Sequence, residues 1–508
     1  MTQSLRLDLS NFADPDLDER FVEYLVRDEA LPRGIHFGRL WAYYRNDLSS
    51  LGVGLPEAEV GAEGDWAACL RPYTQAQEFG LPARITGRTH LGFGGAGVPL
   101  PAYRRKEVVI ENDIGWRVDT GVHYLAGKAV GLESLAEDRS TAGQIESVLA
   151  AVWEANGGQA CFQEMALLGA VYGFVDIVVR ARGESDATRG GQDDARVEAQ
   201  AARAVAIEPV EAPRTLPILE EDDYRRVRYW VQAFRKQVNR VADLPEPGRL
   251  FGPVRPGARE IEAVEILGPR WWQRYEDGRL AAEGSNPLGR VPVVHVQNLP
   301  HPYHYEGLGE VEPLIPLQDE LNTRLSDRAN RVTFQSFKMY LGRGIEGFED
   351  RPVAPGRMWA TDNPDASIEE FGGDASSPSE EVHVEELRQA MDKVSGVTPL
   401  AAGLLRDNLG NLSSATALRV VLMGTLARLE RKRLTYGAGL VETNRMILEA
   451  LDGLGIFRTR PEDRATRPHW PPPLPENLGE KLAEAKAKRE LGVPAETVLR
   501  ELGYGQNE

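Results

Sequence analysis

The strongest periodic pattern of apolar residues lies in the second half of the chain. Leu314, Leu317, Leu321 and Leu325 recur at steps of three and four, which places them on one face of a helix. Charged residues occupy the remaining faces of this stretch. The pattern therefore predicts an amphipathic helix over residues 308–337.

Two further helices are predicted by periodicity and by end signals. The stretch Ser377–Glu380 combines a capping box with proline at the first helical position, and Gly396 follows the last turn. These signals predict a helix over residues 378–396. Leucines at helical spacing then predict a long helix over residues 414–452. The first of these leucines are Leu418, Leu422, Leu426 and Leu429.

The segments around these helices have other patterns. Residues 338–377 are rich in Gly, Pro and short apolar runs, which predicts a small β unit. A loop over residues 397–413 separates the second and third helices, and a proline-rich link precedes a short helical tail within residues 453–508. Residues 1–307 have mixed α and β character, with a polar, flexible loop at about 183–206.

Helix and strand patterns alternate within the first 307 residues. "DERFVEYLVRDEALPRGIHFGRLWAYYRNDL" predicts two short helices, and "AGQIESVLAAVWEANGGQACFQEMALL" predicts two helices with a break at Gly157–Gly158. The mixture of helix and strand patterns predicts an α+β fold. A 508-residue chain exceeds the size of a single hydrophobic core, so we predict several domains. Strands are predicted at Val175–Val179 and in "YRRVRYWVQAF", "REIEAVEILGPRWWQRY" and "VPVVHVQ".

The composition narrows the class of protein. A hydrophobic content of 42% and a charged content of 27% are ordinary for a soluble globular protein. No window approaches ~18 uninterrupted apolar residues, so we expect no membrane span. Cys69 and Cys161 are the two cysteines and lie far apart in the sequence. This spacing argues against a disulfide scaffold or a zinc site and favours a reducing cytoplasm.

The net charge of −18 constrains any contact with nucleic acid. A protein that grips nucleic acid is usually basic, because contacts with phosphates supply the affinity. This chain should repel polyanions on average. If DNA is a partner, we expect it to be passed rather than held.

No motif in the chain predicts catalysis or cofactor binding. Gly92–Gly97 satisfies the G-x-G-x-x-G pattern, but Pro99 and Pro101 follow where a dinucleotide site requires a helix. Gly127 and Lys128 lack the spacing of a phosphate-binding loop. We therefore expect no cofactor, no metal and no enzymatic activity.

Two groups of residues leave alternatives open. His301, His304 and Glu306 are close in sequence, as in a metal-dependent hydrolase, but no further ligand is positioned beside them. Basic residues near the start of the long helix favour a charged helix face over a phosphate contact. They are Arg428, Arg431, Lys432 and Arg433.

Four stretches of the chain resemble segments of one known family. "RRKEVVIENDIGWRVDTGVHYLAGKAV" resembles a segment with the pattern "VD…YL.G", and "WEANGGQACFQEMALLGAVYGFVDIVV" resembles a helix pair before a strand. "GLGEVEPLIPLQDELNTRLSDRAN" is similar to a segment that reads "LQD.LN…S", and "GLLRDNLGNLSSATALRVV" is similar to one that reads "N.SG.AL". In this order they resemble the portal, or head-to-tail connector, proteins of tailed double-stranded DNA bacteriophages. The resemblance is closest to the long-tailed type that infects Gram-positive hosts.

The resemblance implies a multi-domain portal fold that assembles as a ring of twelve copies around a channel at one capsid vertex. The parts would be an α/β wing (1–307), a two-helix stem (308–337 and 378–396), a small β-containing clip (338–377), a tunnel loop (397–413), a long wing helix (414–452) and a short helical crown (453–508).

The implied function is a conduit for DNA packaging and ejection. The implied partners are other copies of the chain, double-stranded DNA, the terminase large subunit, a head-completion or adaptor protein, and the major capsid and scaffolding proteins. The protein would be assembled in the host cytoplasm and reside in the virion, without contact with a membrane. A different minor head or adaptor protein is the alternative, and it would not form a twelve-fold ring by itself.

The resemblance also implies which residues act in each part. The tunnel-loop candidates, which would touch the DNA backbone without reading its sequence, are Leu404, Leu405, Arg406, Asp407, Asn408, Leu409 and Asn411. The stem candidates are Gln318, Asp319, Asn322, Arg324, Arg328, Glu385, Arg388 and Lys393. The candidates for partner docking on the clip are Arg343, Arg351, Arg357 and Trp359.

Overall fold

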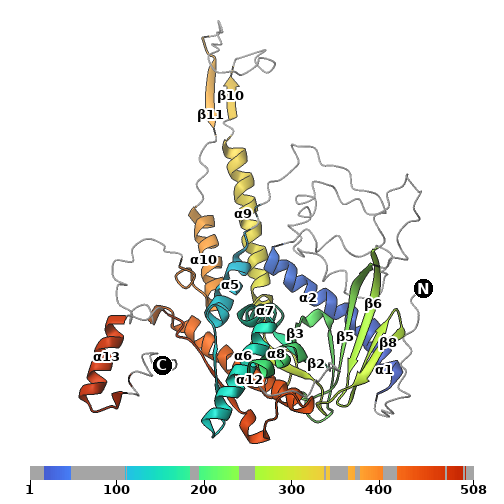
Figure 1. The fold of residues 1–508 in the computed structure, drawn as a ribbon. Helices are drawn as coiled ribbons and strands as arrows, with labels where there is room; N and C mark the ends of the chain where they lie inside the picture. Colours follow the sequence, from blue (N-terminus) through green and yellow to red (C-terminus); the bar gives the residue numbers. More distant parts are fainter. Residues whose placement is uncertain are drawn as a thin grey trace, which may run out of the picture. The chain divides into compact units, whose positions relative to one another are not determined.

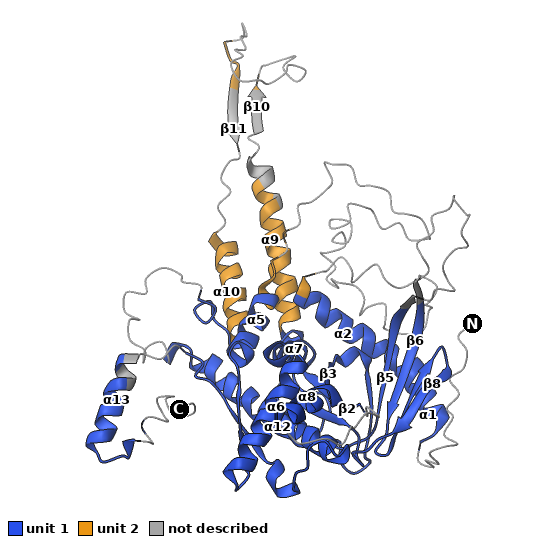
Figure 2. Ribbon diagram, viewed as in Figure 1, with its two compact units in different colours: residues 1–44, 115–313, 395–508 blue, residues 45–114, 314–394 orange. Residues whose placement is uncertain are grey.

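The structure is a computed structural model of the chain. It describes residues 17–46, 109, 111–182, 194–239, 258–336, 339–343, 364–371, 378–403, 420–474, 478–495 and 498. Two compact units are present: unit 1 comprises residues 1–44, 115–313 and 395–508, and unit 2 comprises residues 45–114 and 314–394 (Figure 2). The chain therefore passes from one unit to the other four times.

A three-stranded antiparallel sheet in unit 1 has the strand order β3-β2-β9, and its strands β2 and β3 are labelled in Figure 1. Its middle strand β2 (Phe174–Ala181) is an apolar run that is buried along most of its length. β3 (Val205–Val210) and β9 (Val293–Gln297) flank it. Helices α7 (Gly158–Tyr172) and α12 (Met423–Gly453) pack against this sheet. Both strands predicted for this region, one in β2 and one in β9, are confirmed.

A five-stranded antiparallel sheet, also in unit 1, has the order β4-β5-β6-β7-β8, so each strand pairs with the next along the chain. Its core contains the buried Trp271 and Tyr275 together with Leu17 and Val22 from the N-terminal segment. The strand predictions for this region are confirmed. The strands are β4 (Thr215–Leu219), β5 (Val227–Asn239), β6 (Ala258–Leu267), β7 (Trp271–Glu276) and β8 (Arg279–Ser285).

Arg180 on β2 connects the two sheets of unit 1. Its two terminal nitrogens donate to the two carboxylate oxygens of Glu265 on β6, at 2.8 and 2.7 Å. Its Nε donates to Glu208 on β3 at 2.8 Å. A planar, bidentate pair of this kind has a strict geometry, so it sets the register of one sheet against the other.

Helices and a short strand pair complete unit 1. α6 (Arg139–Ala155) precedes α7, and the predicted break at Gly157–Gly158 is confirmed, with φ of 97° and 51° at the two glycines. β1 (Gly131–Ser134) pairs with β12 (Thr466–His469). The described part of the predicted helical tail is α13 (Leu478–Glu490).

The two helices predicted near the N-terminus correspond to α1 (Glu19–Tyr24) and α2 (Ala30–Arg45). The structure corrects their length and separation: α2 has 16 residues, and a π-helical turn (Leu25–Glu29) joins it to α1 without a break. Pro32, which has no N–H to donate, lies three residues after this turn.

The polar loop predicted at about 183–206 is also corrected by the structure. Residues 194–204 form helix α8, which packs against α6, and β3 begins at Val205. The sequence "DARVEAQAARA" is polar overall, yet five of its residues are alanine, the residue with the highest helix propensity. Residues 183–193 lie outside the described part of the chain.

Among its described residues, unit 2 has the helices α9 and α10 and a two-stranded sheet. α9 (Ile315–Ser336) begins later than residue 308, with Pro316 in its first turn, and α10 (Pro378–Ser395) ends before Gly396 as predicted. β10 (Met339–Arg343) pairs antiparallel with β11 (Ser367–Phe371), which confirms small β structure in this region.

In the described part of the chain, no helix is both long and apolar enough to cross a bilayer.

Several stretches that the sequence analysis singled out fall outside the described residues. They are Gly92–Gly97, the clip residues Arg351, Arg357 and Trp359, and the tunnel-loop residues Leu404, Leu405, Arg406, Asp407, Asn408, Leu409 and Asn411.

A close crossing of two glycines positions the segment that leads into α9. Gly173 has a φ of 95°, and a Cβ there would lie 2.3 Å from the carbonyl oxygen of Gly307. The backbone N–H of Glu310 donates to Ala170 O at 2.8 Å, and that of Asn298 donates to Gly173 O at 2.8 Å. Only glycine permits this approach of the two backbones.

We expect Gly173→Ala to lower the free energy of unfolding by about 3 kcal/mol or more, because both the positive φ and the overlap with Gly307 oppose a side chain. Gly289→Ala is the matched control: its φ is 67° and nothing lies within 4 Å of an added Cβ. The control should lose only about 1 kcal/mol. Urea unfolding of the two variants measures the difference, and equal losses would contradict the close crossing.

Candidate functional site

The four places where the chain passes from one unit to the other are each held, within unit 1, by α5 (Asp113–Ala126) or α12. We call this set of contacts the junction. It consists of Tyr44, Arg117, Asp119, Glu310, Gly396, Thr425, Arg428 and Lys432.

Glu310 is the centre of the junction, and it precedes α9. Glu310 is 6% exposed and Lys432 is 2% exposed. Lys432 Nζ lies 2.7 Å from Glu310 Oε1, and Arg428 Nε lies 3.1 Å from the same oxygen. Gly121 of α5 is adjacent, since a Cβ there would lie 3.2 Å from Glu310 Oε2. The pair of cations therefore holds the segment before α9 against α12.

The same face of α12 holds the residue that follows α10. Thr425 Oγ1 donates to Gly396 O at 2.6 Å. Thr425, Arg428 and Lys432 follow one another at steps of three and four, so they share one side of α12. One helix face thus binds both the chain that enters α9 and the chain that leaves α10.

Helix α5 contributes the remaining contacts. The buried Arg117 donates from Nη1 to Val397 O at 2.6 Å, and its guanidinium lies 4.3 Å from the ring centroid of Trp116. Tyr44 Oη donates to Asp119 Oδ1 at 2.9 Å. Burial, followed by this hydrogen bond, raises the pKa of Tyr44 to about 12, so the hydroxyl remains a donor at neutral pH.

The basic group on α12 is not the uniform charged face that the sequence suggested. Lys432 is buried on Glu310, and Arg428 pairs with the same carboxylate. Arg433 donates to Pro471 O at 2.7 Å. Arg431 is exposed and makes no ion pair within the described residues, so it alone fits the prediction.

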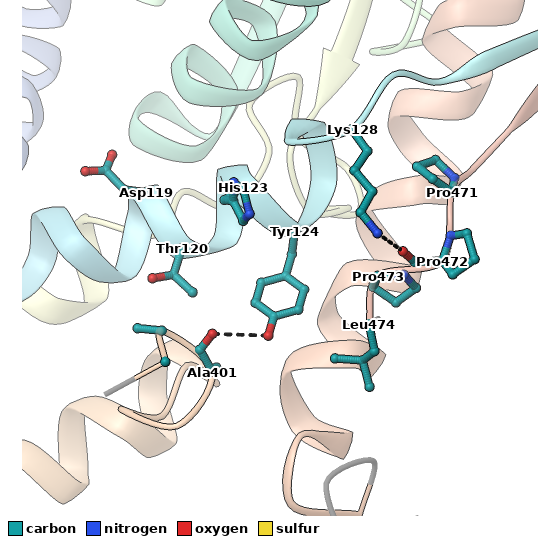
Figure 3. A pocket seen from close by; sticks show the side chains of 12 residues that line it. Asp119, Thr120, His123, Tyr124, Lys128, Ala401, Pro471, Pro472, Pro473 and Leu474 are labelled. Carbon is teal, nitrogen blue, oxygen red and sulfur yellow. Dashed lines mark hydrogen bonds between the residues drawn. The ribbon is translucent and has the colours of Figure 1, made fainter. Parts of the chain in front are cut away.

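A pocket of about 560 Å³ shares Asp119 with the junction (Figure 3). It is lined by α5, residues 401–403 and the proline-rich link. Tyr124 Oη donates to Ala401 O at 3.1 Å, and Lys128 Nζ donates to Pro472 O at 2.8 Å (Figure 3). These bonds are made to backbone carbonyls, so they hold the first part of the predicted tunnel loop and the proline-rich link rather than a bound substrate.

In unit 2, a ladder of polar side chains lies along one face of α9. Gln318, Asn322 and Ser326 recur every fourth residue, and each is at most 2% exposed. Their oxygens accept hydrogen bonds from backbone N–H groups just before α5 and at its first two residues. The donors are the N–H groups of Val109, Glu111, Asp113 and Ile114, at 3.0–3.2 Å.

The ladder revises the predicted apolar face of α9. Leu314 and Leu321 are fully buried as predicted. However, Gln318 and Asn322, which we predicted as functional stem residues, are also buried and bind backbone. Buried backbone N–H groups require hydrogen-bond acceptors. Polar side chains therefore occupy buried positions on α9 where the helical pattern alone would predict apolar residues.

Ion pairs link α9 with α10, and α10 with the segment before α5. Arg328 lies 3.8 Å from Glu381, and Arg388 lies 2.7 Å from Glu111. A further pair joins Arg331 and Glu380, and Glu320 contacts His383 at 3.4 Å. Burial acts to raise the pKa of Glu320, but Arg324 and His383 outweigh it and hold the pKa below its usual value.

The other predicted stem and clip residues occupy different surroundings. Arg324 pairs with Glu320 at 2.7 Å and with Asp327 at 3.6 Å, all on α9. Asp319 and Glu385 are half-buried, whereas Lys393 and Arg343 are exposed. The structure thus brings Gln318 and Asn322 together on one backbone segment, and leaves Lys393 and Arg343 apart from it.

Sequence reasoning missed a buried carboxylate, Asp176, in the middle of β2. Trp230 Nε1 and Tyr305 Oη each donate to it at 2.8 Å, and His295 Nδ1 lies 2.7 Å from it. Burial, and then the charge of Asp176, raise the pKa of Tyr305 well above its usual value. The available signal was a charged residue inside the apolar run "FVDIVV". Both carboxylate oxygens of Asp176 are buried and hydrogen-bonded, so this side chain links β2 to Trp230 on β5 and to Tyr305.

The geometry gives the hydrolase alternative no support. His301 and His304 stack with ring centroids 4.0 Å apart, and Glu306 instead forms an ion pair with Arg33. Within the described ranges, no three His, Cys, Asp or Glu side chains are grouped so that they could hold a metal ion.

Comparison with known proteins gives one family match. Residues 260–507 match the sequence model described as "Phage portal protein, SPP1 Gp6-like". A chain from the virion of a native gene transfer agent particle is 11% identical, with a TM-score of 0.41, over 78% of this chain and 90% of that chain. A chain from the neck of an empty gene transfer agent particle is 13% identical, with a TM-score of 0.44, over 78% and 91%. No curated protein matches this chain.

We expect Gln318→Ala to speed hydrogen exchange at the amides of Asp113 and Ile114 by about tenfold or more, because both lose their acceptor. Gln389→Ala, on an exposed position of α10, is the control and should leave these amides unchanged. Exchange measured by mass spectrometry tests the ladder, and unchanged protection in the first variant would refute it.

We expect Lys432→Met to lower the free energy of unfolding by about 2–3 kcal/mol, because it leaves a buried carboxylate with one cation instead of two. The adjacent Arg431→Met removes an exposed charge that has no ion-pair partner among the described residues, and it should change stability by less than about 0.5 kcal/mol. Urea unfolding compares the two. Similar effects from both substitutions would show that the Glu310 pair does not stabilise the junction.

Proposed function

We propose that the whole chain is a portal protein, because residues 260–507 match the sequence model of SPP1 Gp6-like phage portal proteins. In this proposal twelve copies form a ring at one capsid vertex, and double-stranded DNA passes through the channel during packaging and ejection. The role is structural rather than enzymatic. The family match over residues 260–507 is the observation that carries the proposal.

Contacts between the matched region and the residues before it support extending the proposal to the whole chain. Within unit 1, Arg117 bonds to Val397 and Gly121 packs beside Glu310. Within unit 2, Arg388 pairs with Glu111. Residues on both sides of position 260 therefore share cores and polar contacts, as expected of one functional body.

The charge of the chain is compatible with a channel for DNA. Twelve copies, each with a net charge of −18, would carry on the order of −200 charges before counterions bind. Such a ring would bind phosphates weakly, so DNA would meet few strong stops as it slides. The tunnel loop would provide the closest contact to the DNA backbone. Its candidate residues run from Leu404 to Asn411.

The β10–β11 pair is the candidate for partner docking. It lies between the two stem helices in sequence, as the clip does in the family, and Arg343 is exposed at the end of β10. In this proposal it binds the terminase large subunit and then a head-completion or adaptor protein. The major capsid and scaffolding proteins would surround the ring, which is assembled in the host cytoplasm and remains in the virion.

We expect deletion of Leu404–Asn411 to reduce DNA packaging by at least about tenfold while rings still assemble, because the stem helices, the clip strands and the Glu310 pair remain. Deletion of the equally long Glu184–Gly191 is the control and should package normally. Nuclease-protected DNA measures packaging, and electron microscopy measures ring assembly. Normal packaging by the first deletion would contradict the proposed tunnel loop, and the loss of rings would show that this segment has an assembly role instead.

A further inference from the structure

Helices α9 and α10 of unit 2 are not held by the same kind of contact along their whole length. On α9 the last residue described as buried is Ser326, and on α10 the first is Val384. Beyond these residues, at the ends that lead to β10 and β11, every described residue is partly or fully exposed. Two of them are valines: Val332 is 39% exposed and Val382 is 58% exposed. Apolar burial therefore stops before the two helices reach the β10–β11 pair.

Ion pairs join the two helices in the region where apolar burial stops. Glu380, in the first turn of α10, pairs with Arg331 on α9, and 12% of the Glu380 side chain is exposed. Arg328 Nη2, about one turn earlier on α9, lies 3.8 Å from Glu381 Oε1. We call these two pairs the ionic clasp. It consists of Arg328, Arg331, Glu380 and Glu381.

The clasp and the rest of α10 should respond differently to salt. Three of the four side chains of the clasp are at least 33% exposed. Attraction between exposed charges is weak, and it is screened beyond about 10 Å at 0.1 M salt and about 3 Å at 1 M salt. Val384, Leu387 and Met391 are instead buried, and the hydrophobic effect that holds them is not screened by ions. Salt should therefore weaken the first turns of α10 and not the remainder.

We propose that the ionic clasp is a reversible fastening between α9 and α10. Raised ionic strength separates the ends of the two helices next to β10 and β11, and the rest of both helices stays in place. A helix end without buried residues opens at a much lower free energy than the whole chain. The clasp does not depend on the proposed function, but its consequence does. In a portal protein, an open clasp would let the β10–β11 pair, the candidate clip, change position as it docks a partner.

Hydrogen exchange of the full-length protein at about 0.05 M and about 0.5 M NaCl tests the clasp. We expect the amides of residues 382–385 to exchange about fivefold faster at the higher salt concentration, because they donate to carbonyls of the first turn of α10. The amides of residues 391–395, in the same helix, are the internal reference. They should change by less than about twofold. Mass spectrometry with fragmentation separates the two groups.

A substitution on α9 breaks the clasp without altering the sequence of α10. We expect Arg331→Gln to speed exchange at residues 382–385 about threefold or more at low salt, and to reduce the further effect of added salt. Arg324→Gln is the matched control, because its ion pairs with Glu320 and Asp327 lie within α9. The control should exchange like the wild type at both salt concentrations.

Three outcomes would overturn the clasp. They are equal protection of residues 382–385 at both salt concentrations, a salt response that Arg331→Gln leaves at full size, and a loss of protection along the whole of α10. Each of them would leave the portal function standing. A purified protein that forms no ring would contradict the proposed function instead, and it would leave the exchange result unchanged.

Discussion

The carboxylate of Glu310 lies between Lys432 and Arg428, almost out of contact with water. Removing either cation from a buried carboxylate is costly, because charge in the interior is stable only when it is paired. This pair fixes the path of the chain before α9, and Thr425 on the same helix face fixes the path after α10. The chain just before α9 and the chain just after α10 are therefore both tied to α12, and the rotation of α12 also determines which of its sides faces outward.

The motifs that carry the family resemblance have structural explanations in this chain. The first glycine of "GLGE" is Gly307, and its lack of a side chain lets its backbone pass close to that of Gly173. The glutamine, asparagine and serine of "LQD.LN…S" form the ladder on α9 that binds the N–H groups before α5. These residues hold the stem region together internally. In the proposed function, contacts with DNA and with partner proteins are therefore assigned to other residues, in the tunnel loop and the clip.

Local patterns predicted the elements of the fold but not their partners. Helix-end signals identified α10 and placed its end before Gly396, and runs of apolar and β-branched residues identified β2, β5, β6, β7 and β9. Lys432 and Gln318 look solvent-exposed in the sequence, because their partners Glu310 and Asp113 are remote along the chain. The polar run before β3 was misread for a related reason: helix α8 depends on alanine propensity and on packing against α6, and neither gives an apolar stripe. Asp176 could have been noticed as a charge in an apolar strand, although its donors are distant in sequence.

The central claim is that copies of this chain close into a ring around a channel. Electron microscopy of the purified full-length protein, with class averages viewed end-on, tests it most directly. The account predicts rings with a central hole and twelve-fold symmetry. Small, uniform particles without a hole, under all salt conditions, would contradict it.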